Sequence, residues 1–413
     1  VAAAVLAARQ GVTVLLLESQ GCLGGMGTAG LIPWFCGTDD GKRLLPEGFF
    51  RELRTRLFAK GGFGPWGNEK DDLSFMAIKA EPLKRAYDEM AVEAGVKISF
   101  QTSVIAAEVS GKRVSRLVCS AKSGLFAVEA KVFVDCTGDG DVAEMSGAAF
   151  EKGDANGLMM AFTLCSHWTG IEWEKAAKVK VHDELKRAIS DGVFAIPDYH
   201  LPGIVRSGEN TGGANIGHIF EVDGTNESDL TKAHLHGRKI LEEYRRFYRE
   251  YVDGYANAEP VTSGSLMGVR ETRRITGDYV LNIDDYVNRS NFADEIGRGA
   301  YWIDIHQSKA GKDSYAMFEN TAAQYPLKPG ESYGIPYRSL VVKGLDNLLV
   351  AGRCISVDRP MQSSVRVMGI CYVTGQAAGL AAGMSCASNG ETRAIDTTEL
   401  RRRLIAMRVP ISA

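Results

Sequence analysis

An apolar run that joins a helix to a glycine-rich loop constrains the fold of this chain most. Residues 12–18 read Val-Thr-Val-Leu-Leu-Leu-Glu, and the helical pattern of residues 1–9 ends before them at Gly11. Residues 21–30, just after the run, contain five glycines. A strand that is buried on both faces has a nearly continuous apolar sequence, so the run predicts a strand of a parallel sheet.

The same pattern returns near the end of the chain, and a different one lies between. Helices are predicted at residues 46–59, 81–94, 172–190, 229–251 and 367–390, a β-meander at 96–134, and buried strands at 132–137 and 347–352. Strands and helices alternate at both ends, whereas the middle has long charged helices and aromatic-rich segments. The fold class is therefore α/β: one parallel-sheet domain formed by residues 1–155 and 336–413, with a mixed α/β domain inserted at 156–335.

Composition excludes several classes of function. The net charge of −3 gives no expectation of a basic face for nucleic acid. The eight cysteines include no C-x-x-C pair, which argues against a dithiol centre or a zinc knuckle and fits a reducing, cytoplasmic compartment. Residues 367–390 carry no charge, but their glycines and polar residues favour a buried helix over a membrane span.

The first element matches part of a dinucleotide-binding unit. Such a unit runs strand, G-x-G-x-x-G, helix, strand and acid, and Glu18 stands where the acid binds the adenosine ribose. The first strand and its glycines would lie before Val1, so we expect the chain to begin partway through the unit. The alternative is an ordinary α/β unit whose strand happens to end in Glu.

Two further glycine strings match the fingerprint only as strings. Residues 62–67 have no strand before them and are expected to form a surface turn. Residues 138–143 follow a strand, but Asp139 and Asp141 would lie beside the pyrophosphate, which is electrostatically unfavourable. A second nucleotide unit, and hence a pyridine-nucleotide-dependent reductase, is therefore disfavoured.

Several segments together resemble one family. Residues 14–30, 135–141, 270–279, 303–306 and 349–379 are similar, in this order, to the FAD-dependent oxidoreductases of the glutathione-reductase-like superfamily. The resemblance covers essentially the whole chain. It implies a Rossmann-like FAD-binding domain, an inserted substrate domain, and hydride transfer between a small organic substrate and flavin N5. The alternative is a non-catalytic flavin-binding or nucleic-acid-associated protein of the same fold.

The resemblance also implies which residues bind FAD. Glu18 would bind the ribose, the loop with Gly24, Gly25, Met26 and Thr28 would lie along the flavin and pyrophosphate, and the turn with Thr137, Gly138 and Asp139 would line the adenosine half. Gly352, Arg353 and Arg366 would hold the ribityl chain and the edge of the ring. The glycine stripe in residues 375–383 is expected to serve close helix packing.

Asp304 and His306 are the candidate catalytic pair. If residues 301–306 form a strand, both side chains share one face, and a carboxylate beside an imidazole suits a general base. The alternative is a purely structural pair. Arg274, in a cluster with Arg270 and Arg273, and Arg338 could hold an anionic substrate, or could form ion pairs with local acids.

No metal site is expected, because the histidines show no ligand spacing in the sequence. The expected partner is a small-molecule substrate, with no nucleic acid and no membrane. Assembly into a homo-oligomer is left open.

Overall fold

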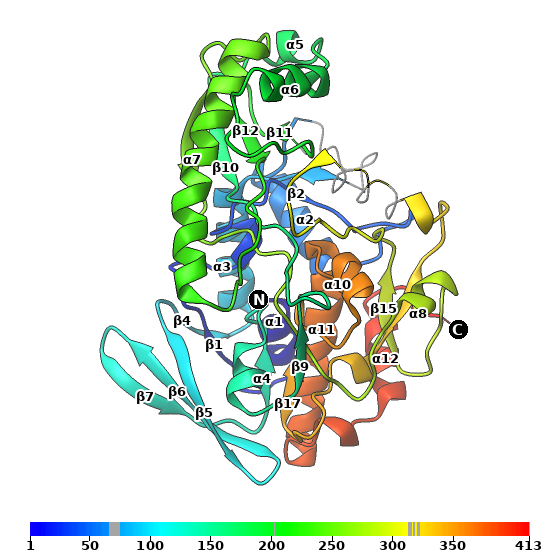
Figure 1. Cartoon of the computed structure of the whole chain (residues 1–413). Helices are drawn as coiled ribbons and strands as arrows, with labels where there is room; N and C mark the ends of the chain where they lie inside the picture. The colour runs from blue at the N-terminus through cyan, green and yellow to red at the C-terminus, as the bar shows by residue number, and fades with distance from the viewer. Residues whose placement is uncertain (66–74, 202, 313–315, 317–318, 320–322, 413) are drawn as a thin grey trace.

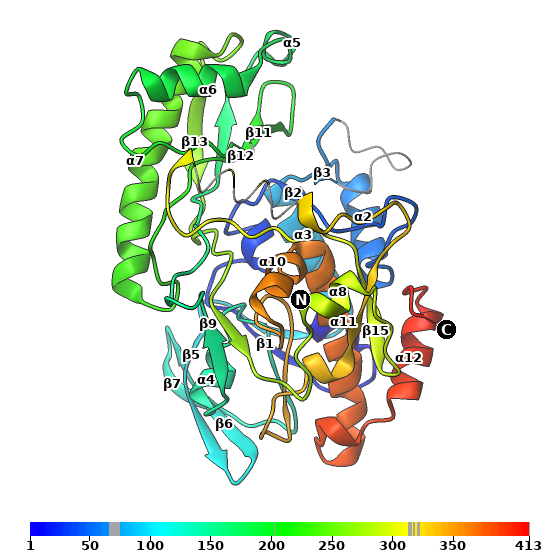
Figure 2. The same cartoon turned by 45° about the vertical axis from the view of Figure 1, so that its right-hand side comes forward.

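The chain forms two hydrophobic cores. The computed structural model describes residues 1–65, 75–201, 203–312, 316, 319 and 323–412. The larger core contains buried side chains from residues 2–148 and 275–409, and the smaller core contains those from 159–267. Figures 1 and 2 show the smaller domain above the larger one, with the long helix α7 (Glu227–Tyr251) along its outer side.

The larger domain takes in residues that the sequence analysis assigned to the insertion. Its elements are α1 (Ala2–Ala8), β1 (Leu15–Leu17), η1 (Gly25–Gly27), β2 (Trp34–Phe35), α2 (Phe49–Ala59), β3 (Met76–Ala77), α3 (Ala80–Glu93), β4 (Lys97–Ser99), β5 (Ser103–Ser110), β6 (Arg113–Ala121), β7 (Gly124–Val128), β8 (Phe133–Asp135), α4 (Asp141–Met145), β9 (Phe150–Lys152), β14 (Arg273–Ile275), α8 (Ile283–Val287), β15 (Glu295–Gly299), β16 (Tyr333–Pro336), η2 (Tyr337–Ser339), β17 (Leu348–Val350), α10 (Arg359–Val365), α11 (Met368–Ser385), η3 (Cys386–Ser388), η4 (Thr392–Ala394) and α12 (Thr397–Ala406). The larger core therefore includes residues before the predicted boundary at 335. The reason is that β15 pairs with β16 and packs on α11 and α12.

The parallel strands form two pairs. β1 pairs with β4, with Leu15 opposite Lys97, and β8 pairs with β17, with Phe133 opposite Leu348. The predicted meander is therefore shorter than expected: it consists of β5, β6 and β7, and residues 97–99 belong to the parallel sheet instead. The reason is α3, which precedes β4 and serves as the crossover that a parallel connection requires.

The inserted domain is a four-stranded antiparallel sheet covered by helices. Its elements are β10 (Ser166–Thr169), α5 (Trp173–Ala176), α6 (Val181–Ser190), β11 (Gly203–Arg206), β12 (Gly212–Asn215), α7 and β13 (Glu259–Ser263), with strand order β11-β12-β10-β13. The single helix predicted at 172–190 is wrong, since α5 and α6 are separate. Trp173 of α5 packs on Tyr255, whereas Leu185 and Ala188 of α6 are buried in the domain core.

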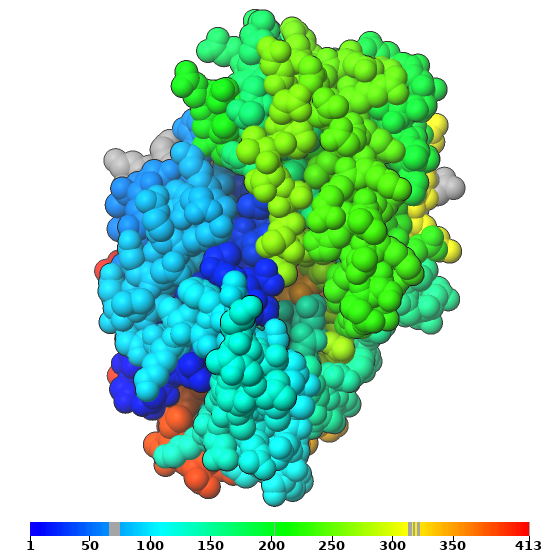
Figure 3. Space-filling view, turned by 90° about the vertical axis from the view of Figure 1, so that its left-hand side faces the viewer, coloured from blue at the N-terminus to red at the C-terminus, as the bar shows by residue number. Residues whose placement is uncertain are grey.

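Figure 3 shows this green domain beside the blue and cyan surface of the larger domain, with the dark-blue N-terminal residues visible between the two. Among the described residues, no single helix is long and apolar enough to cross a membrane. One helix pair, Arg359–Val365 with Met368–Ser388, reaches the required length and composition together, but it is bent by 93° at the break.

The glycine stripe of α11 allows its backbone to contact α1. A Cβ at Gly379 would overlap the carbonyl oxygen of Ala3, and one at Gly375 would lie 3.3 Å from the Cβ of Ala2. The predicted close packing is confirmed. Because α1 lies on this face, the glycines fix how α11 sits under the parallel strands.

We predict that Gly379→Ala destabilises the protein by about 1–3 kcal/mol, because the overlap with a backbone atom outweighs the gain of about 1 kcal/mol in helix propensity. The midpoint of urea unfolding measures the change. Gly375→Ala is the matched control in the same helix, since its contact needs only a few tenths of an ångström of adjustment, and its midpoint should stay close to that of the parent protein. A Gly379→Ala midpoint at or above the parent value would contradict the packing role.

Candidate active site

Three loops follow the carboxyl ends of parallel strands. Glu18 and the glycine loop follow β1, residues 137–140 follow β8, and Gly352 follows β17. Since β8 and β17 are hydrogen-bonded neighbours, their loops lie side by side, and Arg353 forms an ion pair with Asp139 at 2.7 Å. The crevice outside the carboxyl ends is where open α/β sheets bind nucleotides.

Glu18 has room to bind a ligand. It is partly exposed, and its Oε1 accepts hydrogen bonds from the N–H of Gln20 at 2.8 Å and from the hydroxyl of Ser19 at 3.4 Å. Its Oε2 has no partner among the described residues. A carboxylate held in place through one oxygen, with the other oxygen available, is suited to accept a hydrogen bond from a ribose hydroxyl.

Two neighbouring glycines of the glycine loop have different surroundings. Gly24 (φ 106°) could not carry a side chain, because a Cβ would overlap the ring of Tyr87, whereas a Cβ at Gly25 (φ 53°) would meet nothing within 4 Å. Met26 is partly exposed. The hydroxyl of Thr28 is buried and donates to the carbonyl of Leu23 at 2.6 Å, so it braces the loop from inside.

Asp135 organises the turn after β8. Its buried carboxylate accepts hydrogen bonds from the Thr137 N–H and hydroxyl at 2.9 and 2.7 Å, and from the Ala143 N–H at 2.9 Å. Burial raises the pKa of Asp135. Gly138 (φ 82°) leaves the space in which the Arg353 guanidinium lies. The Arg353 guanidinium therefore packs against this turn.

The acids of this turn are neutralised within the protein. Asp139 Oδ1 accepts from Arg353 at 2.7 Å and from the Thr272 hydroxyl at 2.6 Å, and Asp141 pairs with Arg273 at 2.8 Å. The repulsion expected between these carboxylates and a pyrophosphate is thereby reduced. The assignments of Thr28, Thr137, Asp139 and Arg353 as cofactor ligands stay predictions, and each side chain already has a partner in the loops.

Asp304 and His306 lie together, although not on a strand. Residues 300–306 follow β15 without strand pairing, because they are fixed by α10 instead: the Asp304 N–H donates to Ser363 Oγ at 3.0 Å, and Ser364 Oγ donates to the Tyr301 carbonyl at 2.6 Å. The predicted strand is wrong. Nevertheless, Asp304 Oδ1 lies 3.4 Å from His306 Nε2.

Arg366, at the junction between α10 and α11, completes this group. Its Nη2 donates to Asp304 Oδ2 at 2.7 Å and to the Asp304 carbonyl at 3.2 Å. Burial would raise the pKa of Asp304, but the neighbouring His306 and Arg366 hold it well below its ordinary value. Burial lowers the pKa of His306, assisted by the positive charge of Arg270. The pair is thus a carboxylate beside a neutral imidazole.

Sequence reasoning missed the histidines around this pair. His306 Nδ1 lies 3.1 Å from His218 Nε2, and His218 Nδ1 lies 3.0 Å from Asp198 Oδ2. The ring of His200 lies against both imidazoles. Burial, followed by the charge of His218, lowers the pKa of His200 to about 3. The sequence carries no spacing signal, because the three histidines come from three separate segments.

A small cavity opens beside these histidines. It holds about 30 Å³, and its lining residues are Ala161, Asp198, Tyr199, His200, His218, Phe220, His306, Gln307, Lys309, Ala310 and Gly311. Most of these come from the inserted domain, whereas His306 to Gly311 come from the segment after β15. The cavity therefore lies where the two domains meet.

Arg274 and Arg338, the predicted substrate-binding arginines, do not lie beside the histidines. Arg270, not Arg274, is near the histidines: it is buried and donates to the Ala161 carbonyl at 2.7 Å. Arg274 pairs with Glu271 at 2.7 Å, and the half-exposed Arg338 pairs with Asp294 at 3.0 Å. These contacts are the ion pairs with local acids of the alternative interpretation, and the catalytic roles of Arg274 and Arg338 stay predictions.

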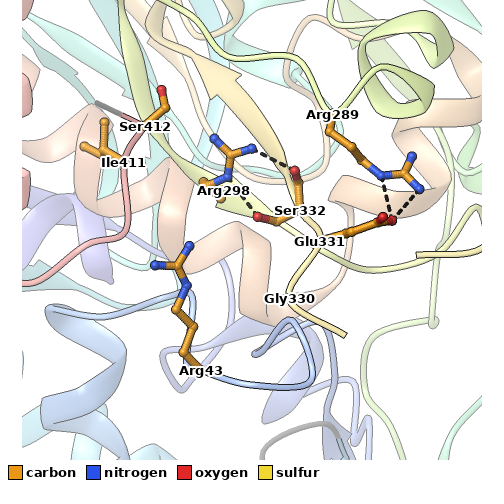
Figure 4. A pocket seen from close by; sticks show the side chains of 8 residues that line it. All are labelled: Arg43, Arg289, Arg298, Gly330, Glu331, Ser332, Ile411 and Ser412. Atoms are coloured by element: carbon orange, nitrogen blue, oxygen red, sulfur yellow. Dashed lines mark hydrogen bonds and ion pairs between the residues drawn. The ribbon is translucent and has the colours of Figure 1, made fainter. Parts of the chain in front are cut away.

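A larger pocket of about 330 Å³ contains none of the predicted site residues. Figure 4 shows Arg289 and Arg298 on its wall, each bound to a neighbour: Arg289 to Glu331 at 2.9 Å and Arg298 to Ser332 at 2.8 Å. Arg43, also on the wall, pairs with Asp40 at 3.2 Å. Since these guanidinium groups already have partners, the pocket is not a built anion site.

The fold and the loops define a two-domain α/β protein with a nucleotide crevice. A family model described as FAD dependent oxidoreductase matches residues 1–404, and the chain belongs to this family. It is an FAD-dependent oxidoreductase, as the resemblance implied, and FAD is its cofactor. The non-catalytic alternative is therefore set aside. No curated protein matches the chain.

Several solved structures are similar to this chain at low sequence identity. A geranylgeranyl bacteriochlorophyll reductase-like protein from Thermoplasma acidophilum is 11% identical over 98% of this chain and 80% of its own, with a TM-score of 0.48. A p-nitrophenol 4-monooxygenase from Pseudomonas putida is 10% identical over 98% and 80%, with a TM-score of 0.45. A flavin-dependent brominase is 12% identical over 98% and 81%, also with a TM-score of 0.45.

The residues present fit FAD. The Oε2 of Glu18 is available, Gly25 faces open space, and a Cβ at Gly352 would meet only Cys371 Sγ at 3.8 Å. Side chains at Gly25 and Gly352 would occupy open space beside the loops. At Gly24 and Gly138, by contrast, a side chain would overlap residues of the protein itself. The expected FAD ligands among the described residues are thus Glu18 and the backbone at Gly25 and Gly352.

We predict that Glu18→Ala weakens FAD binding about 10- to 100-fold, since a hydrogen bond to a charged group contributes about 1.5–3 kcal/mol. Fluorescence quenching of FAD titrated into flavin-stripped protein measures the affinity. Glu129→Ala, which removes an exposed carboxylate on the distant meander edge, is the control and should bind FAD as the parent does. Unaltered affinity in Glu18→Ala would remove Glu18 from the ribose site.

Proposed function

We propose that the protein exchanges hydride between FAD and a small organic molecule that binds beside Asp304 and His306. The observation that carries this proposal is the contact of Arg366, which lies between α10 and α11, with Asp304, whose carboxylate lies 3.4 Å from His306 on the wall of the cavity. One continuous set of side chains therefore joins the crevice at the parallel strands to a cavity at the domain junction. Enzymes of this cofactor class need these two sites to adjoin.

Different residues of the chain would hold different parts of the cofactor. Bound FAD supplies a flavin ring that accepts or donates hydride at N5. Glu18 holds the adenosine ribose, and the backbone at Gly25 and Gly352 approaches the phosphates and the ribityl chain. The first turn of α11 has N–H groups without partners within the helix, and this positive end favours negative charge on a ring bound against it.

Arg366 is positioned to add to that effect. Its Nη2 is held by Asp304, while its buried Nε has no partner among the described residues. A guanidinium fixed on one side directs its remaining donors toward the crevice without losing further side-chain freedom. Arg366 therefore stabilises negative charge at the edge of the ring, and Asp304 keeps it in place.

His306 is the group that we assign to the substrate's reacting oxygen. The imidazole lines the cavity, and Asp304 fixes its orientation from the other side. A general-base role stays a prediction. It requires a ring nitrogen that faces substrate, whereas Nδ1 lies 3.1 Å from His218 and Nε2 lies 3.4 Å from Asp304. Only the longer contact with Asp304 is weak enough to be exchanged readily for a substrate hydroxyl.

The visible absorption spectrum of the purified protein tests the proposal. We expect flavin bands, and we expect small alcohols, hydroxy acids and amines, offered one at a time without oxygen, to include a compound that bleaches them. Flavin that no organic hydride donor or acceptor reduces or reoxidises would overturn the proposed reaction while leaving the family assignment intact.

We predict that His306→Ala slows reduction of the flavin by such a substrate about 100-fold or more, the range for losing a group that acts on a reacting proton or oxygen. Bound FAD should remain, because His306 lies against Asp304, His218 and His200 at the domain junction. Anaerobic stopped-flow absorbance measures the rate. His182→Ala, which removes an exposed histidine of α6, is the control. An unchanged rate in His306→Ala would exclude the assignment.

A further inference from the structure

Three imidazole rings form a nearly equilateral triangle at the domain junction. The ring centres of His218 and His306 are 5.0 Å apart, those of His200 and His306 are 5.0 Å apart, and those of His200 and His218 are 5.1 Å apart. One nitrogen of each ring lies within 4.8 Å of the others. The three nitrogens therefore form one group of candidate metal ligands.

The triangle has the dimensions of a metal tripod. With metal–nitrogen bonds of about 2.0–2.1 Å, each ring centre lies about 3.1 Å from the ion, and tetrahedral angles then place ring centres about 5 Å apart. Ligand nitrogens would be about 3.3 Å apart in the same geometry. The separation of 3.1 Å between His218 Nε2 and His306 Nδ1 is close to that value.

The outer nitrogens of two rings face carboxylates. His218 Nδ1 lies 3.0 Å from Asp198 Oδ2, and His306 Nε2 lies 3.4 Å from Asp304 Oδ1. Imidazoles that bind metals usually donate their second N–H to a carboxylate in this way, which fixes the ring and leaves a lone pair on the inner nitrogen. Asp198 is itself held, because its carboxylate accepts from the N–H groups of His200 and His218.

This arrangement leaves two inner lone pairs pointing at each other. If both outer nitrogens donate to carboxylates, His218 Nε2 and His306 Nδ1 are both acceptors, and two acceptors at 3.1 Å need a cation between them. A proton would bridge these two nitrogens alone, whereas a metal ion would take one ligand nitrogen from each of the three imidazoles.

We propose that His200, His218 and His306 bind a divalent transition-metal ion, with Asp198 and Asp304 orienting two of the ligands. Imidazole ligands suit zinc, iron, copper and nickel, and three histidines with one open position are typical of a catalytic rather than a structural ion. The fourth position faces the cavity. Its volume of about 30 Å³ is room for a water molecule or for the reacting oxygen of a substrate.

Two carboxylates and two guanidinium groups surround the histidines. The negative charges of Asp198 and Asp304 attract a dication, whereas Arg366 already pairs with Asp304 and the buried Arg270 opposes the ion. The ion would hold the reacting oxygen of the substrate in place of direct contact with His306. This consequence rests on the proposed function, whereas the binding of the metal does not.

Metal binding is measured on the full-length, FAD-loaded chain. Elemental analysis of the protein as purified should find zinc or another transition metal. After removal with a chelator, zinc chloride titrated in a calorimeter should bind with one ion per chain. His200→Gln should abolish this binding, and it is the variant of choice because His200 is only partly buried and its loss leaves the pairs with Asp198 and Asp304 in place.

Asp198→Asn tests the orienting role. Zinc affinity should fall about 10- to 100-fold, the usual effect of losing a carboxylate behind a ligand histidine. His182→Ala, with its exposed histidine, should bind zinc as the parent does. Unfolding midpoints confirm that each variant is folded. A folded parent protein that takes up no zinc, or His200→Gln binding zinc as tightly as the parent, would overturn the site.

The two proposals fail separately. Flavin reduction that depends on His306 in a protein without metal affinity would leave the hydride reaction standing and remove the metal. Metal bound by the three histidines, with flavin reduction unaffected by His306→Ala, would do the reverse.

Discussion

The ion pair between Asp304 and Arg366 is the interaction on which the candidate site depends. Both side chains are largely buried, and their atoms are 2.7 Å apart. Removing one partner from such a pair leaves an uncompensated charge and typically costs 3–5 kcal/mol. Because Arg366 lies between α10 and α11 and Asp304 belongs to the segment after β15, the pair fixes these two segments to each other. Because His306 lies next to Asp304, the ion pair also fixes the position of His306.

A second ion pair, between Arg353 and Asp139, fixes the cofactor loops to each other. Arg353 joins the turn after β8 to the turn after β17, and its other donor reaches the Val269 carbonyl at 2.7 Å. Val269 packs against the smaller core, so the arginine joins the loops of the parallel strands to the segment that returns from the inserted domain. Buried ion pairs add little net stability. Their value in this protein lies in fixing loops that have no strand pairing of their own.

The sequence predicted the elements whose signals are local. The run ending at Glu18, the helix with Gly379 and the strand before Gly352 all have continuous patterns, and the structure contains each of them. The prediction for residues 97–99 was wrong because alternating patterns do not distinguish a meander strand from a short parallel one. The strand at residues 301–306 was wrong because side-chain hydrogen bonds to Ser363 and from Ser364 take the place of strand pairing. The contact between Asp304 and His306 survived this error, since the two residues are close in the chain.

The histidine cluster could not have been found from spacing. His200 and His218 lie in the inserted domain and His306 in the segment that returns to the larger one, so only the docking of the two domains brings them together. The same docking places the charges of Arg270 and Asp198 around them. A site divided in this way is also sensitive to the domain interface: a shift of about 1 Å between the domains would separate the ligand nitrogens beyond the reach of one ion, since metal–nitrogen bonds vary by only about 0.2 Å.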